Sequence, residues 1–262
     1  MGTLSLNRSK EIYRRQFPEI ASVTEFEYSV DGVDRLSRNL DKKHGFLNPS
    51  EVAFIIVEPI QGEGGYRIPS DEFMHKLEAV RSQHQIPVIA DEIQSGLSRT
   101  GERWGADHYE LSPDVITSAK ALRVGATISN SDIFPSDTGR LSSTWGAGDI
   151  ISSAIGALTL DVIEEQNLRQ NATRRGTQFK EEIRAKALQG VVDVRGYGLM
   201  LAIEVESADD RDAILREAFK QGLVLLGCGE KTIRILPPLD LRQREIDIAA
   251  DLFKEAVQTV SS

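Results

Sequence analysis

Two ionisable residues, Asp91 and Lys120, stand at the ends of two successive apolar runs. The first run covers residues 86–90 and the second covers residues 114–119. Runs of this kind are typical of strands buried on both faces of a parallel sheet, with the residue that follows at the carboxyl end. Open α/β sheets bind their ligands at that end. We therefore expect Asp91 and Lys120 to lie close together at one edge of a sheet.

This pair of residue types can do a specific kind of chemistry. A partly desolvated lysine can lose its proton and form a Schiff base with an aldehyde. An aspartate from a neighbouring strand can keep a pyridine nitrogen protonated. Proteins that bind pyridoxal phosphate hold it with these two groups together. A lysine or aspartate at a strand end is more often only the polar residue where the chain meets water, so the surrounding motifs have to decide.

Five short motifs, two of which contain the pair itself, lie within residues 52–239. They cover residues 57–65, 90–96, 119–122, 143–146 and 233–239. In content and order they resemble the class III aminotransferases, which include the 4-aminobutyrate, ornithine, acetylornithine and lysine ε-aminotransferases. The resemblance implies an α/β protein of the pyridoxal-phosphate-dependent transferase fold type I. It also implies a large domain with a mostly parallel sheet, present in part, and a small C-terminal α+β domain.

The resemblance assigns roles to four residues around the cofactor. Lys120 resembles the lysine that forms the Schiff base, and Asp91 resembles the partner of the pyridine nitrogen. Gln94 matches a glutamine that contacts the phenolic oxygen of the cofactor. Thr144 matches a threonine that reaches the phosphate of the cofactor in the neighbouring subunit, which implies a homodimer with shared active sites.

The resemblance assigns two further residues to the substrate. Glu63 and Arg234 match a glutamate and an arginine that pair with each other and admit or exclude a substrate carboxylate. From its position alone, Arg234 could equally pair with an acid on the solvent face of a strand. Pro237 and Pro238 end that strand and would hold a planar guanidinium at a fixed edge, which suits bidentate carboxylate binding. Glu58 matches an acidic position to which the resemblance gives no role.

The chain departs from the family pattern in two places. Residues 122–127 lack the glycine-rich run that is common after the lysine, and with residues 143–146 they favour the lysine ε-aminotransferase side. The phosphate-binding turn and the aromatic residue that stacks on the pyridine ring lie upstream of the Glu-Pro motif in the family, and this sequence has neither. Residues 1–10 resemble the segment after that aromatic residue. The chain is therefore expected to correspond to the C-terminal part of a family subunit.

Composition restricts the class of protein. The chain has 262 residues, 40% hydrophobic and 27% charged, as in ordinary globular proteins. A net charge of −9 argues against nucleic acid as a partner, and no apolar stretch is long enough to predict a membrane span. The four histidines show no metal-ligand spacing, so no metal is expected. The single cysteine, Cys228, excludes an internal disulfide and favours a cytoplasmic location.

The pattern of elements predicts two domains, residues 1–155 and residues 156–262. Residues 1–50 are polar and without a clear period, and the βαβ pattern of a parallel sheet begins at the predicted strand 52–57. In the first domain we expect a helix over residues 70–84, capped by Ser70, and strands ending near Asp91 and Lys120. A long helix is predicted within residues 148–188. Beyond it we expect strands at 191–194, 198–205, 222–226 and 231–236, and helices at 208–221 and 242–259.

Three functional hypotheses follow. The first is an aminotransferase that moves an amino group from an ω-amino or diamino acid to a 2-oxo acid. The second is a truncated, catalytically weak or silent protein of the same fold that acts through dimerisation or a partner. It would lack backbone donors to the cofactor phosphate, each worth roughly 1.5–3 kcal/mol. The third is a racemase or aminomutase of the same family, which would use the same cofactor residues.

Overall fold

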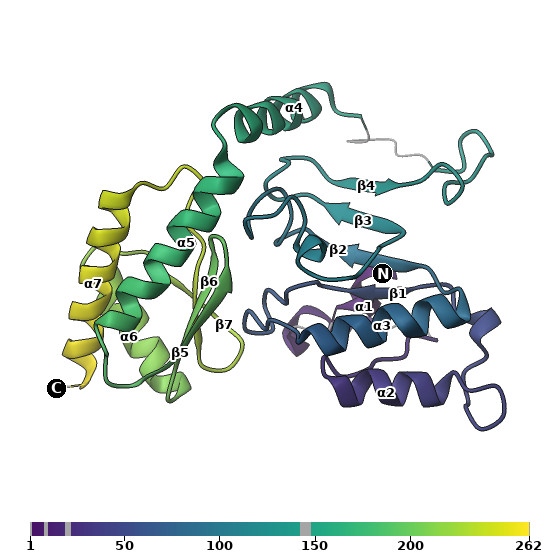
Figure 1. Ribbon diagram of the computed structural model, residues 1–262, viewed down its shortest axis with the longest axis horizontal. Coiled ribbons are helices and arrows are strands. Elements are labelled where there is room, and N and C mark those ends of the chain that lie inside the picture. Colours follow the sequence, from purple (N-terminus) through teal and green to yellow (C-terminus); the bar gives the residue numbers. More distant parts are fainter. Residues whose placement is uncertain (1, 8–9, 19–21, 142–147, 262) are drawn as a thin grey trace.

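The computed structural model describes residues 2–7, 10–18, 22–141 and 148–261 (Figure 1). The first sheet has the strand order β1-β2-β3-β4. Strands β1 (Ile55–Val57), β2 (Val88–Asp91) and β3 (Val115–Ser118) are parallel neighbours, and β4 (Ala126–Ser129) runs antiparallel to β3. Two of the three pairings are thus parallel, which confirms the mostly parallel sheet that the sequence predicts.

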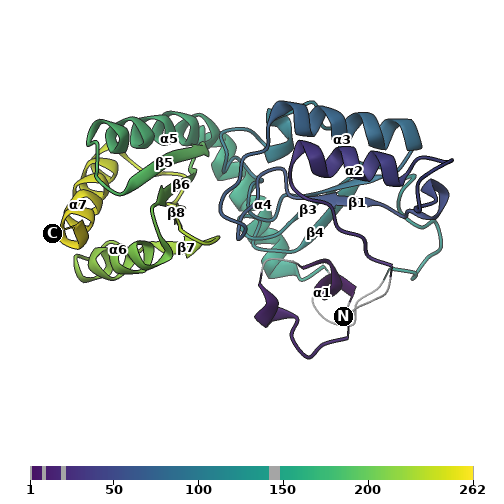
Figure 2. The same cartoon turned by 90° about the horizontal axis from the view of Figure 1, so that it is seen from below.

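Helix α3 (Asp71–His84) crosses over from β1 to β2. It begins as predicted, because the Ser70 hydroxyl accepts a hydrogen bond from the Phe73 amide at 3.2 Å and satisfies one of the free N–H groups of the first turn. The apolar face of α3 packs against strands β1 and β2 of the sheet. This packing covers one face of the strands that lead to the candidate site (Figure 2).

The N-terminal 50 residues contain more structure than the sequence predicts. They form α1 (Gly2–Leu6), the 3-10 turn η1 (Glu11–Tyr13) and α2 (Val30–Asn39). Helix α2 lies beside α3 and is amphipathic. Val30, Val33 and Leu36 recur at helical spacing behind the Ser29 cap, so the sequence does contain the period of this helix and the prediction of no clear period is wrong there. Two further 3-10 turns are η2 (Pro49–Glu51) and η3 (Gly105–His108).

The prediction of a single long helix within residues 148–188 is wrong. The chain forms two helices, α4 (Ile150–Glu165) and α5 (Leu168–Ala185). They are separated at Asn167, whose φ of 52° lies in the left-handed region and turns the chain. Figure 1 shows α4 above the first sheet and α5 descending into the second half of the molecule.

The second half is an antiparallel sheet covered by helices, as predicted for a small α+β domain. Its strand order is β5-β6-β8-β7. The elements are β5 (Val191–Tyr197), β6 (Met200–Val205), α6 (Ala208–Lys220), β7 (Leu226–Cys228), β8 (Thr232–Ile235) and α7 (Gln243–Ser261). The strand predicted at residues 222–226 begins only at Leu226, because the stretch from 222 to 225 is the connection that brings the chain from α6 back to the sheet edge.

The two halves contact each other through loops at the ends of their sheets. The partly buried Arg99 donates from Nη1 to the carbonyl oxygens of Leu199, at 3.4 Å, and Pro237, at 2.5 Å. The ring of His108 stacks on that of Tyr197 with centroids 4.3 Å apart. These contacts bring the carboxyl edge of the first sheet against β8 and its neighbours.

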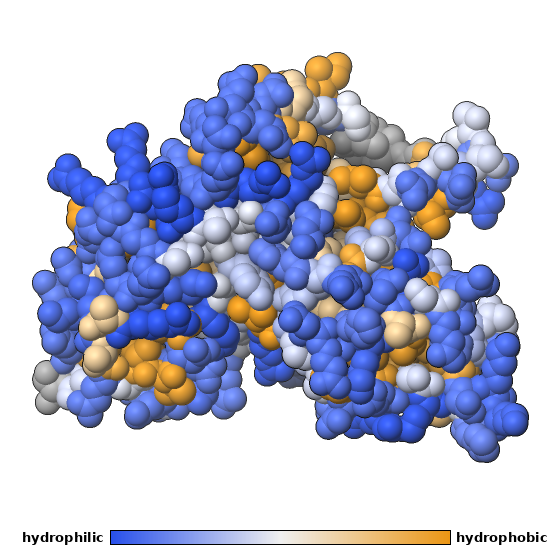
Figure 3. Space-filling view, in the orientation of Figure 1, coloured by the Kyte–Doolittle hydropathy of each residue, from blue (hydrophilic) through white to orange (hydrophobic). Residues whose placement is uncertain are grey.

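Helix α4 carries an apolar face that nothing in the described chain covers. Ile150 is 83% exposed, Ile151 72% and Leu158 63%, while Ile163 on the same helix is buried. The space-filling view shows apolar surface around α4 at the top of the molecule (Figure 3). No helix among the described residues combines the length and apolar character that a membrane crossing needs.

Candidate functional site

Asp91 and Lys120 come from neighbouring parallel strands. Asp91 is the last residue of β2 and pairs with Thr117 of β3, and Lys120 follows the end of β3 by two residues. Asp91 Oδ1 accepts hydrogen bonds from the Ile93 amide at 3.1 Å and from Thr117 Oγ1 at 3.3 Å. Both bonds end on Oδ1, so Oδ2 has no donor within the described part of the chain. One carboxylate oxygen is therefore held and the other is available to a ligand.

The Lys120 amine lies among four charged side chains from three segments of the chain. Partial burial is the main cause that lowers its pKa, and the Arg234 guanidinium lowers it further. Glu63, Glu58 and Asp91 act in the opposite direction without cancelling these effects. Lys120 is exposed as a whole residue, yet the atoms packed around its amine lower its pKa, so its neutral form is populated at lower pH than in an ordinary lysine. A neutral amine is the form that can act as a nucleophile or a base.

Glu58, Gly62 and Gln94 form one side of the site. Glu58 Oε2 accepts a hydrogen bond from the Gly62 amide at 2.8 Å, and burial raises the pKa of this carboxyl. Gln94 packs closely on Gly62, since a Cβ at position 62 would lie 2.3 Å from Gln94 Oε1 and would force the Gln94 side chain to move. Gln94 Oε1 is buried without a hydrogen-bond partner among the described residues. A buried amide group without a partner indicates that a ligand completes this side.

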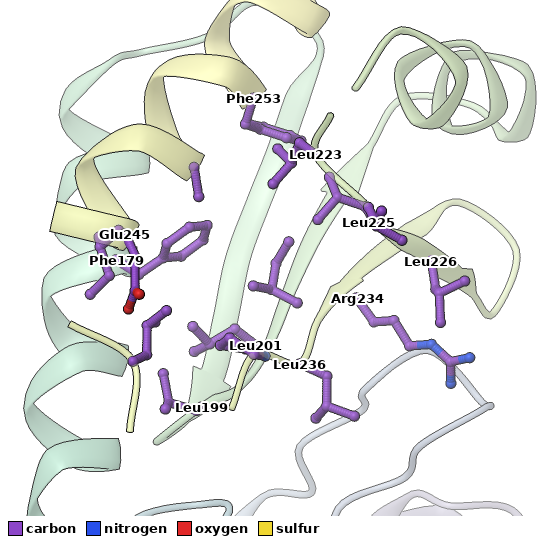
Figure 4. Close-up of a pocket in the computed structure, with 16 residues that line it drawn as sticks. Phe179, Leu199, Leu201, Leu223, Leu225, Leu226, Arg234, Leu236, Glu245 and Phe253 are labelled. Atoms are coloured by element: carbon purple, nitrogen blue, oxygen red, sulfur yellow. The ribbon is translucent and has the colours of Figure 1, made fainter. Parts of the chain in front are cut away.

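Glu63 and Arg234 form an ion pair between the two halves of the molecule. Glu63 lies in the loop after β1, and Arg234 in β8, where Arg234 Nη1 donates to Glu63 Oε1. Figure 4 shows Arg234 at the margin of an apolar pocket of about 200 Å³ in the second half, with its guanidinium pointing away from the leucine and phenylalanine side chains. The resemblance predicts this pair.

Glu92, next to Asp91, stabilises the backbone around the site. Its side chain is 1% exposed, and its carboxylate accepts bonds from Ser95 Oγ at 2.6 Å, the Gly105 amide at 2.8 Å and the Ala106 amide at 2.7 Å. Burial raises its pKa, and these three hydrogen bonds offset the effect only in part. Glu92 thus holds the loop after β2 in a fixed conformation.

The structure brings together most of the residues that the sequence predicts. The Lys120 amine interacts electrostatically with Asp91, Glu63 and Arg234. Gln94 packs against Gly62, in the loop that carries Glu63. Thr144 lies outside the described residues, so its role stays a prediction. The sequence reasoning missed Lys10, whose Nζ lies 3.2 Å from Glu63 Oε2. No local pattern marks Lys10, because its partner is distant in the sequence.

Comparison with known proteins decides the family. The family model described as aminotransferase class-III matches residues 1–257 of this chain. The chain belongs to the class III aminotransferases. In this family member the matched region includes Asp91 at the end of β2, Lys120 after β3, and Arg234.

Related sequences and structures agree with this class III assignment. The chain is 34% identical to the acetylornithine aminotransferase of Prochlorococcus marinus over 90% of its own length and 57% of that protein. It is 32% identical to the acetylornithine aminotransferase of Archaeoglobus fulgidus, over 97% and 64%. The lysine aminotransferase of M. tuberculosis, in the internal aldimine form, has a similar structure, with a TM-score of 0.87 at 26% identity over 99% of this chain and 63% of that one. The chain thus spans less than two thirds of these relatives, and its fold is that of fold type I.

Class III aminotransferases use pyridoxal phosphate, and the residues of this chain fit that cofactor. Lys120 provides an amine with a lowered pKa, Asp91 a carboxylate oxygen without a donor, and Gln94 a buried amide oxygen without a partner. These are the groups that would hold an aldehyde carbon, a pyridine nitrogen and a phenolic oxygen. No group of three or more His, Cys, Asp or Glu residues in the described ranges could hold a metal ion.

The surroundings of Lys120 make its titration sensitive to its charged neighbours. We expect labelling of Lys120 by acetic anhydride to rise with pH around a midpoint below 10.5, the ordinary lysine value. Because Arg234 lowers the Lys120 pKa and Glu63 raises it, Arg234→Met should move the midpoint up and Glu63→Gln should move it down. Peptide mass spectrometry across a pH series measures both. The exposed Lys42 serves as the internal reference, and shifts in the same direction for both variants would contradict the arrangement.

Proposed function

We propose that this chain carries the catalytic residues of a pyridoxal-phosphate-dependent aminotransferase, which moves an amino group from an ω-amino or diamino acid to a 2-oxo acid. The observation that carries the proposal is the placement of the Lys120 amine beside Asp91 and beside the Glu63–Arg234 pair. The similarity to acetylornithine, ornithine and lysine aminotransferases supports a diamino acid as donor.

Pyridoxal phosphate, when bound, supplies an aldehyde carbon for the amino group and a ring that accepts electrons. In the proposed mechanism Lys120 Nζ would hold the cofactor at its aldehyde carbon and would take and return a proton at the substrate carbon. The lowered Lys120 pKa favours this role, since the amine must be neutral to accept a proton. Asp91 Oδ2 would keep the ring nitrogen protonated, and Gln94 would orient the ring through its amide.

The Glu63–Arg234 pair selects between substrates by charge. While Glu63 neutralises Arg234, an amine at the far end of the donor meets no unpaired cation. When Glu63 leaves Arg234, the guanidinium is free to bind the carboxylate of an acceptor such as 2-oxoglutarate. In the proposed cycle one site therefore serves a donor and an acceptor of opposite terminal charge.

Cofactor attachment tests the proposal directly. The purified chain is mixed with pyridoxal phosphate, its visible absorption is recorded, and borohydride is added before peptide mapping. We expect the pyridoxyl phosphate group on Lys120 and not on Lys180, although burial lowers the Lys180 pKa too. Transfer from ornithine, lysine or 4-aminobutyrate to 2-oxoglutarate would then separate an aminotransferase from a racemase or aminomutase. Attachment without transfer would favour a catalytically silent protein, and label spread over many lysines would contradict the proposal.

We also propose that the chain acts as a homodimer with shared active sites, and that the exposed face of α4 lies in the interface. The face is apolar and follows directly after the segment that contains Thr144. Replacing Leu158, which is 63% exposed, by glutamate should weaken self-association by on the order of tenfold or more, since burying one leucine contributes about 1.5–3 kcal/mol. Sedimentation equilibrium measures the effect. Phe219→Glu, at an exposed position on α6, is the control. If both variants associated equally, the proposal that α4 lies in the interface would be wrong.

A further inference from the structure

The Glu63 carboxylate lies between two cations. Its Oε1 accepts from Arg234 Nη1, and its Oε2 lies 3.2 Å from Lys10 Nζ. Burial alone would raise the Glu63 pKa, but the hydrogen bonds from Lys10 and Arg234 more than offset it and leave the pKa lowered. The pKa of Lys10 is raised, with the hydrogen bond to Glu63 as the main cause. Each oxygen of Glu63 thus has its own cation, from a different segment.

The backbone of the Glu63 loop is held in place on both sides. The Gly229 amide donates to the Glu63 carbonyl at 2.8 Å, and Arg195 Nη2 donates to the Gly65 carbonyl at 2.8 Å. Gly229 has a φ of 55°, and a Cβ there would lie 2.9 Å from Gly65 Cα, so only glycine permits this contact. When Glu63 leaves Arg234, rotation of the side chain is therefore the expected movement.

Arg234 has donors to spare for a substrate. Its Nε is buried without a hydrogen-bond partner among the described residues, and Glu63 engages Nη1. A guanidinium binds a carboxylate best with two parallel N–H donors. A substrate carboxylate bound to the free donors of Arg234 would lie close to the Glu63 carboxylate, and repulsion between the two anions would drive Glu63 away from Arg234. The displaced carboxylate then needs another cation, because an unpaired charge in a partly desolvated site is unfavourable.

We propose that Lys10 determines substrate specificity by holding the Glu63 carboxylate while a substrate carboxylate occupies Arg234. The inference rests on the proposed aminotransferase function. Lys10 suits the task because its side chain is 47% exposed and remains charged, and because it approaches the oxygen that Arg234 does not use. Lys10 thereby favours the state that accepts a ligand with a terminal carboxylate. It acts through Glu63 and is a positioning residue.

Two ligands that differ only in terminal charge test this inference. Glutarate and 4-aminobutyrate have the same three methylenes, but glutarate ends in a second carboxylate where 4-aminobutyrate has an ammonium group. Their Kd values are measured by isothermal titration calorimetry on the full chain without added cofactor, so that no turnover occurs. In Lys10→Met we expect the ratio of the glutarate Kd to the 4-aminobutyrate Kd to rise about two- to fivefold, the range of a partly exposed ion pair.

Matched variants separate this role from a general loss of charge. Lys10→Arg should restore the ratio, and Lys42→Met, which removes an exposed lysine elsewhere, should leave it unchanged. In a Glu63→Gln background the Lys10→Met substitution should have no further effect on the ratio. An unchanged ratio in Lys10→Met, or the same change with and without Glu63, would overturn the inference while leaving the aminotransferase proposal intact. That proposal fails instead if the cofactor does not attach to Lys120.

Discussion

Under the proposed function, Lys120→Ala will lower the rate of amino transfer by on the order of 100- to 10,000-fold, the usual contribution of a positioned general acid–base group. The Lys120 amine is the one placed beside Asp91, Glu58, Glu63 and Arg234, and its lowered pKa makes it available as a base. Alanine removes the amine without adding bulk. Single-turnover absorbance with ornithine or lysine as donor measures the rate of the first half of the reaction.

Added primary amines distinguish a chemical role of Lys120 from a structural one. If Lys120 moves a proton, methylamine or ethylamine should restore part of the rate in Lys120→Ala, and the restored rate should follow the basicity of the amine. Lys180→Met is the matched control, because Lys180 is also partly buried but lies on α5 and donates to the Gly196 carbonyl at 2.8 Å. Full activity in Lys120→Ala would refute the assigned role.

Glu92→Ala will lower the free energy of unfolding by about 2–6 kcal/mol. The substitution leaves the amides of Gly105 and Ala106 buried without an acceptor, and each such group costs about 1–3 kcal/mol. Glu92→Gln keeps one acceptor oxygen and should fall between the wild type and the alanine variant. Urea unfolding followed by circular dichroism gives the values.

A nearby exposed acid provides the comparison for Glu92. The side chain of Glu102 is 44% exposed and lies 3.6 Å from Arg169, an arrangement worth about 0–1 kcal/mol. Glu102→Ala should therefore change the stability little. Because Glu92 precedes the loop that carries Gln94, its alanine variant should also weaken cofactor binding. If Glu92→Ala and Glu102→Ala were equally stable, the buried hydrogen bonds of Glu92 would not hold the loop.

Several elements could be predicted from short stretches of sequence. The strands that end at Asp91 and just before Lys120 follow from continuous apolar runs, and α3 follows from the Ser70 cap and its apolar spacing. These signals are local, since they depend on residues within one or two turns of each other. In contrast, α2 and the break at Asn167 escape the prediction although both leave local signals: Val30, Val33 and Leu36 repeat at helical spacing, and asparagine is one of the few residues that readily adopt the left-handed conformation.

By itself, the sequence determined the chemistry that is available: a lysine and an aspartate at the ends of buried strands, and the motifs of a class III aminotransferase. Only the tertiary structure decided which charges meet. Glu63 contacts Lys10 on one oxygen and Arg234 on the other, and these three residues belong to segments far apart in the chain. Such contacts depend on how both halves of the molecule pack, because the energy of an ion pair is set by distance and burial and not by spacing along the sequence.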